Sequence, residues 1–136
     1  MKQYLLLLFL LTGFLAAEAK HITGGEMIYE YVETNSGGKV YKVTLILFRD
    51  ELSGGAEMPP TVTIGIFNND NRGLIENRSV GLVSTQLLPI NGLPRCITNQ
   101  PNLSYTSGYY IFEVVVPTSN ASGLTLAYQT CCSSLP

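Results

Sequence analysis

The sequence predicts an all-β fold: an antiparallel, immunoglobulin-like β-sandwich of about seven strands. Three observations predict it. Beyond residue 19 the apolar residues recur with a period of two, as in strands, and not with the period of 3.6 that marks helices. Clusters of Gly, Pro and Asn separate the alternating stretches at short intervals, and no window has a helical period. Because each such strand has one apolar face to bury, packing two sheets face to face is the expected solution.

Seven stretches carry the alternation. In chain order they are 27–32, 40–48, 61–66, 74–77, 79–88, 109–116 and 124–129. The stretch 109–116 is the strongest, with Tyr110, Phe112 and Val114 on one face and Glu113 on the other. The residues expected to share one face of the other clear strands are Met27, Tyr29, Tyr31, Tyr41, Val43, Leu45, Leu47, Val62, Ile64, Ile66, Leu124, Leu126 and Tyr128.

Turn residues fill the intervals between these strands. Residues 68–73 are rich in Asn and end in Gly, which is typical of a hairpin turn. A calcium loop of the EF-hand kind would need an oxygen donor where Arg72 stands and a Glu where Ser79 stands, so the turn is preferred. Three Gly-Gly pairs suit turns and bulges. The irregular stretch 89–108 is the longest, and we expect a binding loop there.

The first 19 residues form a predicted signal peptide. A short positive start precedes an apolar run over residues 4–17, and Ala17-Glu18-Ala19 has the small-x-small form of a cleavage site. The run is shorter than the about 20 residues that a membrane-spanning helix needs. We therefore expect an exported, secreted or cell-surface protein whose single domain spans residues 20–136, with no membrane span in the mature chain.

Composition excludes several classes of protein. Charged residues make up 13% of the chain and apolar residues 46%, which is incompatible with a disordered acidic tail. The 8 Lys and Arg residues form no cluster, so we expect no nucleic-acid partner. The length allows one domain, and no linker divides it.

The chain has three cysteines, Cys96, Cys131 and Cys132. An oxidising compartment favours a disulfide, and adjacent strands can bring Cys96 to either member of the C-terminal pair. Such a bridge would stabilise the fold by roughly 3.5–4 kcal/mol through loop entropy. The third thiol remains for another chain or for sequence outside this one. The spacing contains no Cys-x-x-Cys, and a metal site is not expected.

The order of several motifs resembles a known family. The chain opens with His21-Ile22-x-Gly24-Gly25-Glu26, continues with a Tyr-rich strand and Leu45-x-Leu47-Phe48-Arg49-Asp50, and then has Ile64-Gly65-Ile66-Phe67 before an Asn-rich turn. It closes with Leu126-Ala127-Tyr128-Gln129-x-Cys131-Cys132. This resembles the N-terminal domain of large secreted surface proteins of gliding bacteria, which carry tandem β-sandwich repeats and a C-terminal sorting domain for type IX secretion.

Two departures from that family matter. The family usually has Cys after the Arg-Asp pair, whereas Glu51 follows it here, which would account for the odd number of cysteines. The family usually continues beyond Cys-Cys into further domains, whereas this sequence ends at Pro136 without the sorting domain. The resemblance therefore implies a fragment of a longer gene or a truncated relict, with further domains of the same polypeptide or other cell-surface components as partners.

We expect no catalytic residues, cofactor or metal. A Ser-His-Asp hydrolase would depend on His21, the sole histidine, but that residue would be the second of the mature chain and no G-x-S-x-G elbow exists. The acidic residues show no spacing that singles out a catalytic pair. The predicted function is therefore that of a non-catalytic exported module with an adhesive or structural role.

A secreted carbohydrate-binding module is the alternative, with glycans as ligands. The tyrosines Tyr105, Tyr109 and Tyr110 cluster beside the long loop and are the candidate ligand contacts. The competing interpretation is that one of each adjacent pair packs inward and the other covers the sheet. Three triplets match the N-glycosylation acceptor and are read as turns in a bacterial protein, at Asn77, Asn102 and Asn120.

Overall fold

The computed structural model describes residues 22–88 and 102–129. This part of the chain forms six strands and a single 3-10 turn, η1 (Glu51–Ser53), and contains no α-helix. The strands are β1 (Ile22–Asn35), β2 (Gly38–Asp50), β3 (Thr61–Asn68), β4 (Leu74–Leu88), β5 (Tyr105–Val116) and β6 (Leu124–Tyr128). The all-β class predicted from the alternation is confirmed. No helix in these residues has the length and apolar character to span a membrane.

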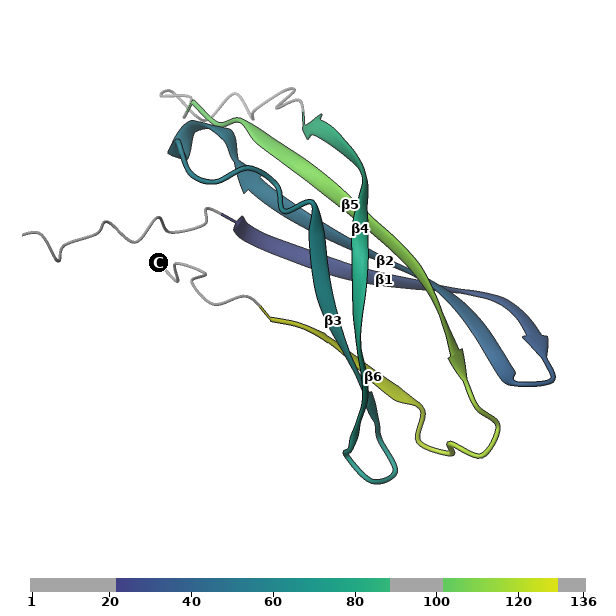
Figure 1. Ribbon diagram of the computed structural model, residues 1–136. Coiled ribbons are helices and arrows are strands. Elements are labelled where there is room, and N and C mark those ends of the chain that lie inside the picture. Colours follow the sequence, from purple (N-terminus) through teal and green to yellow (C-terminus); the bar gives the residue numbers. More distant parts are fainter. Residues whose placement is uncertain (1–21, 89–101, 130–136) are drawn as a thin grey trace, which may run out of the picture.

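All strand pairs are antiparallel, and they form one curled sheet in the order β1-β2-β5-β4-β3-β6. The curl is centred on β4, which changes partner along its length. Its first half, up to Gly81, pairs with β3, and its second half, from Leu82, pairs with β5. Strands β3 and β4 consequently cross β1, β2 and β5 at a marked angle (Figure 1).

The core lies between these two crossing groups of strands. Leu45 and Leu47 of β2 and Tyr110 of β5 pack in one cluster with Val62 and Ile64 of β3. These side chains are the ones that the period of two assigned to a common face, so that part of the prediction is confirmed. A second, smaller cluster continues the core toward the β1–β2 turn, and its buried members are Val43, Ile66 and Val114.

Several predicted boundaries are wrong. Strand β1 begins five residues before the predicted stretch 27–32 and ends three residues after it. The stretches 74–77 and 79–88 are one strand, β4, because the ladder to β3 runs straight through Asn77 and Arg78. The pattern suggested a break there because both side chains are polar. In the strand, Asn77 is exposed, and Arg78 on the other face is half-buried with its guanidinium 6.0 Å from the centre of the Phe112 ring. The glycosylation triplet at Asn77 is therefore in a strand and not in a turn.

Strand β5 also begins four residues earlier than predicted, at Tyr105. Residues 105–108 pair with the end of β2 on one side and the end of β4 on the other, so they belong to the sheet. The predicted binding loop 89–108 is accordingly shorter at its C-terminal end. Residues 89–101 of that loop lie outside the described part of the chain.

The turn predicted between the first two strands is confirmed. A two-residue turn at Ser36 and Gly37 joins β1 to β2, and the Asn35 side chain accepts hydrogen bonds from the backbone amides of Gly37 (2.8 Å) and Gly38 (3.2 Å). Gly38 has φ of 141°, and a Cβ there would lie 2.1 Å from the Val116 carbonyl oxygen. Only glycine fits at this position, where β2 passes against the end of β5.

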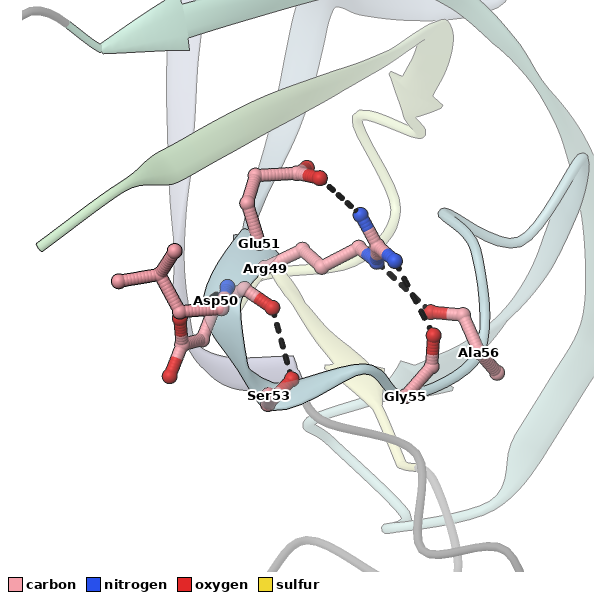
Figure 2. A network of polar contacts seen from close by, with 7 residues as sticks. Arg49, Asp50, Glu51, Ser53, Gly55 and Ala56 are labelled. Carbon is pink, nitrogen blue, oxygen red and sulfur yellow. Dashed lines mark hydrogen bonds and ion pairs between the residues drawn. The ribbon is translucent and has the colours of Figure 1, made fainter.

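An arginine fixes the connection that leaves β2. The Arg49 guanidinium pairs with Glu51 and donates to the carbonyls of Ala56 (Nε, 2.7 Å) and Gly55 (Nη2, 3.0 Å) (Figure 2). Hydrogen bonds from Arg49 and Thr106 hold the pKa of Glu51 below its usual value. The loop between β2 and β3 is thus held by hydrogen bonds and an ion pair from one arginine.

Tyr110 ties β5 to the start of β3. Its side chain is fully buried, and its hydroxyl donates to the Pro59 carbonyl at 2.6 Å. Pro59 and Pro60 immediately precede β3, where a proline leaves no ladder hydrogen bond unmade. Burial, with a smaller contribution from Tyr128, raises the pKa of Tyr110 to about 12.

The first prediction concerns this hydrogen bond. Tyr110→Phe keeps the ring in the core but leaves the Pro59 carbonyl without its donor, so we expect the free energy of unfolding to fall by about 1 kcal/mol at neutral pH. Denaturant unfolding measures the change. Tyr109→Phe, whose hydroxyl makes only long contacts of 3.4 Å with Gln86 and Ser107, is the matched control and should be close to wild type.

The same residue predicts a dependence on alkaline pH. Because the folded pKa lies above the ordinary value of 10.0, the unfolded chain releases the Tyr110 proton first. The stability due to this group is complete below pH 10 and is lost as the pH rises toward 12. We expect wild type to lose more stability over this interval than Tyr110→Phe. Equal losses in the two proteins would contradict the assignment.

Candidate functional site

The three predicted ligand-contact tyrosines do not form a common platform. Tyr110 points into the core, so its inclusion is wrong: a fully buried ring with an occupied hydroxyl has no surface for a ligand. Tyr105 and Tyr109 are half-buried on the opposite face of β5. The competing interpretation, with one tyrosine of the adjacent pair inward and the other covering the sheet, describes Tyr109 and Tyr110 correctly.

The other predicted residues lie outside the described part of the chain. These are the disulfide candidates Cys96, Cys131 and Cys132, together with His21. The disulfide and its partner therefore stay predictions. Among the described residues, no group of three or more His, Cys, Asp or Glu side chains is placed to hold a metal ion.

The structure has a groove near the β1–β2 turn. It has a volume of about 800 Å³ and lies between the inner face of β1, β2 and β5 and the loop 117–123 that joins β5 to β6. Its apolar floor includes Val43, Val116 and Leu124. This volume is within the range of about 300–1,000 Å³ that is typical of small-molecule sites. We take this groove as the candidate functional site.

Tyrosines line one side of the groove. Tyr29 of β1 and Tyr41 of β2 are lining residues whose ring centroids lie 6.0 Å apart at 77°. Tyr31 extends the group, 5.8 Å from Tyr41 and also edge to face. Tyr29 is 72% exposed and Tyr31 57%, so large aromatic surfaces face solvent at the groove mouth. We call these three residues the tyrosine cluster.

Asn120 lies on the opposite side, in the loop 117–123. The residue is 9% exposed, and neither Nδ2 nor Oδ1 has a hydrogen-bond partner among the described residues. Its backbone amide donates to the Pro117 carbonyl at 3.0 Å, so the turn interpretation of this glycosylation triplet is confirmed. A buried carboxamide without partners is unfavourable by about 1–3 kcal/mol, so its presence calls for an explanation.

The β3–β4 turn holds the loop that carries Asn120. The Asp70 carboxylate accepts from the backbone amides of Ser122 (2.9 Å) and Ala121 (3.1 Å). Asn69 donates from its side chain to the Ser122 carbonyl at 3.1 Å and accepts from the Thr125 hydroxyl at 2.7 Å. The Asn-rich turn at 68–73 therefore positions one wall of the groove.

The electrostatics of the groove are simple. Lys39 carries the one charge among the lining residues, all of which belong to the described part of the chain. The remaining polar groups are hydroxyls, backbone groups and the Asn120 carboxamide. The arrangement can hold a molecule with apolar faces and hydrogen-bonding edges, and the cation of Lys39 favours a negative group on it.

Sequence reasoning missed Tyr29, Tyr41 and Asn120 as site residues. A signal for the tyrosines existed: a hairpin turning at 36–37 places Tyr31 opposite Tyr41 and Tyr29 opposite Val43, which the structure has. No local signal marks Asn120, because its burial depends on a turn some 50 residues earlier in the chain.

Comparisons with family models, curated proteins and solved structures found no match to this chain. The resemblance to surface proteins of gliding bacteria therefore stays a prediction.

The Asp70 contacts predict an acid-dependent anchoring of the loop. Hydrogen bonds from Ser122, then from Ala121, hold the Asp70 pKa below its ordinary value of 3.8. The folded carboxylate thus stays ionised to lower pH than the unfolded one, and its stabilising effect is lost only as the pH falls through the lowered pKa. We expect the Ser122 amide resonance to titrate with a midpoint below 3.8. Asp70→Ala should abolish that titration and speed hydrogen exchange at Ser122; an unchanged exchange rate would contradict the anchoring.

Proposed function

We propose that this chain is a non-catalytic, exported β-sandwich module with immunoglobulin-like connectivity that acts in adhesion at a bacterial cell surface. The observation that carries the proposal is the groove between the tyrosine cluster and Asn120, which offers a contact surface and no reacting group. Its partners are further domains of the same polypeptide or other cell-surface components.

The sandwich is supported by the way the inner faces meet. Side chains from β2 and β5 pack against side chains from β3 within one core cluster, and Leu126 and Tyr128 of β6 join from the edge. Two layers of antiparallel strands with a shared core are the defining arrangement of such folds. The partner change in β4 supplies the link between the layers.

A binding role is supported over catalysis by the chemistry of the groove. General acid–base catalysis requires a titratable group poised to exchange a proton with substrate. The charged residue at the groove, Lys39, is exposed, and the lining residues include no Asp or Glu that could exchange a proton with it. Exposed aromatic rings and an amide are binding groups.

Export and surface location are supported by the sequence. The predicted signal peptide over residues 1–19 and the predicted bridge from Cys96 to Cys131 or Cys132 both fit an oxidising compartment. The resemblance to gliding-associated surface proteins adds the cell surface and the adhesive role.

A secreted carbohydrate-binding module is the second candidate function. The exposed rings of Tyr29 and Tyr31 favour it, because sugar rings stack on such surfaces.

Export and the bridge are tested together by the intact mass of the product from its native cells. We expect cleavage after Ala19 and a mass two protons below that of the reduced form, with one thiol open to alkylation after denaturation. A product that retains residues 1–19, or that carries three alkylatable thiols, contradicts the exported, bridged module.

Adhesion is tested with beads that carry the purified chain. We expect these beads to adhere to the producing cells, and Tyr29→Ala beads to adhere at least severalfold less. Tyr109→Ala is the matched control, because it removes a tyrosine from the outer face of β5 and leaves the groove intact. Equal adhesion by beads that carry wild type, Tyr29→Ala or Tyr109→Ala and by uncoated beads would contradict the adhesive role.

A further inference from the structure

We propose that the groove binds a pyranose sugar of a glycan, stacked on Tyr29 and Tyr41 and hydrogen-bonded by Asn120, with Lys39 favouring a carboxylate-bearing unit. This inference rests on the proposed binding role and names the chemical class of the ligand. Four side chains from three separate segments, β1, β2 and the loop 117–123, converge on this one groove.

Asn120 gives the strongest argument. A residue in a surface loop would ordinarily turn its carboxamide to water, yet both polar atoms are buried without partners among the described residues. A carboxamide donates and accepts at once, which matches the paired hydroxyls of a sugar. Because Asn120 also lines the groove, a turn of its carboxamide toward the groove on binding would let a sugar supply the partners that the described residues do not.

The tyrosine cluster supplies the complementary apolar contact. A pyranose has a face of C–H groups, and the exposed ring of Tyr29, with the half-buried ring of Tyr41 beside it, presents aromatic surface at the mouth of the groove. The edge-to-face packing against Tyr41 also holds the Tyr29 ring in place, so less side-chain entropy is lost when a ligand binds.

A donated β-strand is the competing occupant, because β6 is an edge of the sheet with a free side. Its main chain would pair with that edge and its apolar side chains would enter the groove. Apolar side chains would give the Asn120 carboxamide no hydrogen-bond partner and would place no negative group near the Lys39 cation. The polar groups of the groove therefore favour a sugar.

Affinity electrophoresis through gels that contain a soluble polysaccharide tests the inference. The probes are polygalacturonate, which carries carboxylates, and the neutral hydroxyethylcellulose and dextran.

We expect retardation by at least one probe, strongest with polygalacturonate, and about tenfold weaker binding in Tyr29→Ala, Tyr41→Ala and Asn120→Leu. Lys39→Ala should remove the preference for the acidic probe. Tyr109→Ala and Asn102→Ala, at residues away from the groove, should bind as wild type.

The thermal stability of Asn120→Leu separates a ligand role from a structural one. Replacing an unpartnered carboxamide with an apolar group of similar size leaves no polar atom buried unpaired, so this variant should melt at the same temperature as wild type or higher while losing binding. A lower melting temperature would assign Asn120 to the fold and overturn its role in the site.

Three further results would overturn the inference. Equal retardation of wild type and Tyr29→Ala would place glycan binding elsewhere. A dimer of the full chain that dissociates in Tyr29→Ala would make a second copy the occupant. If no probe retards the chain while beads carrying it still adhere to cells, a sugar is rejected as the ligand, and the proposed adhesive role is not contradicted.

Discussion

The fold depends on a change of partner within one strand. Between Gly81 and Leu82, β4 leaves β3 and begins to pair with β5, and the Leu82 amide donates to the Pro60 carbonyl at the same point. Without this change the sheet would continue as a single layer and its apolar face would stay in water. With it, Ile64 of β3 meets Tyr110 of β5, and the core forms between residues distant in the sequence.

The same curl creates the groove. Strands β1, β2 and β5 have 14, 13 and 12 residues, whereas β3 and β6 have 8 and 5, so β3 and β6 cannot cover the whole inner face. The uncovered part carries Tyr29 and Tyr41, and the loop 117–123 closes its far side. Asp70 and Asn69 hold that loop from the β3–β4 turn, so the position of this wall of the groove depends on that hairpin as well as on the core.

The sequence predicted which side chains face inward better than where strands begin and end. Alternation depends on each strand's own residues, so Leu45, Ile64 and Val114 could be placed without knowing their neighbours. The break at Asn77 was wrong because a pairing partner overrides local polarity. The tyrosines Tyr29 and Tyr41 needed the hairpin register, and Asn120 needed long-range contacts, so the site was less predictable than the core.

Strand β1 is the longest free edge of the sheet, and its chemistry bears on aggregation. Two bulges, between Ile22 and Gly24 and between Tyr31 and Glu33, interrupt its regular spacing, and Glu26, Glu30 and Glu33 place negative charge along it. The bulges disturb the regular spacing of hydrogen-bonding groups, and the glutamates would repel those of an identical strand. Both features therefore oppose edge-to-edge pairing between copies of this chain. Many copies crowded at high local concentration would therefore remain separate units, although each carries 14 residues of open strand.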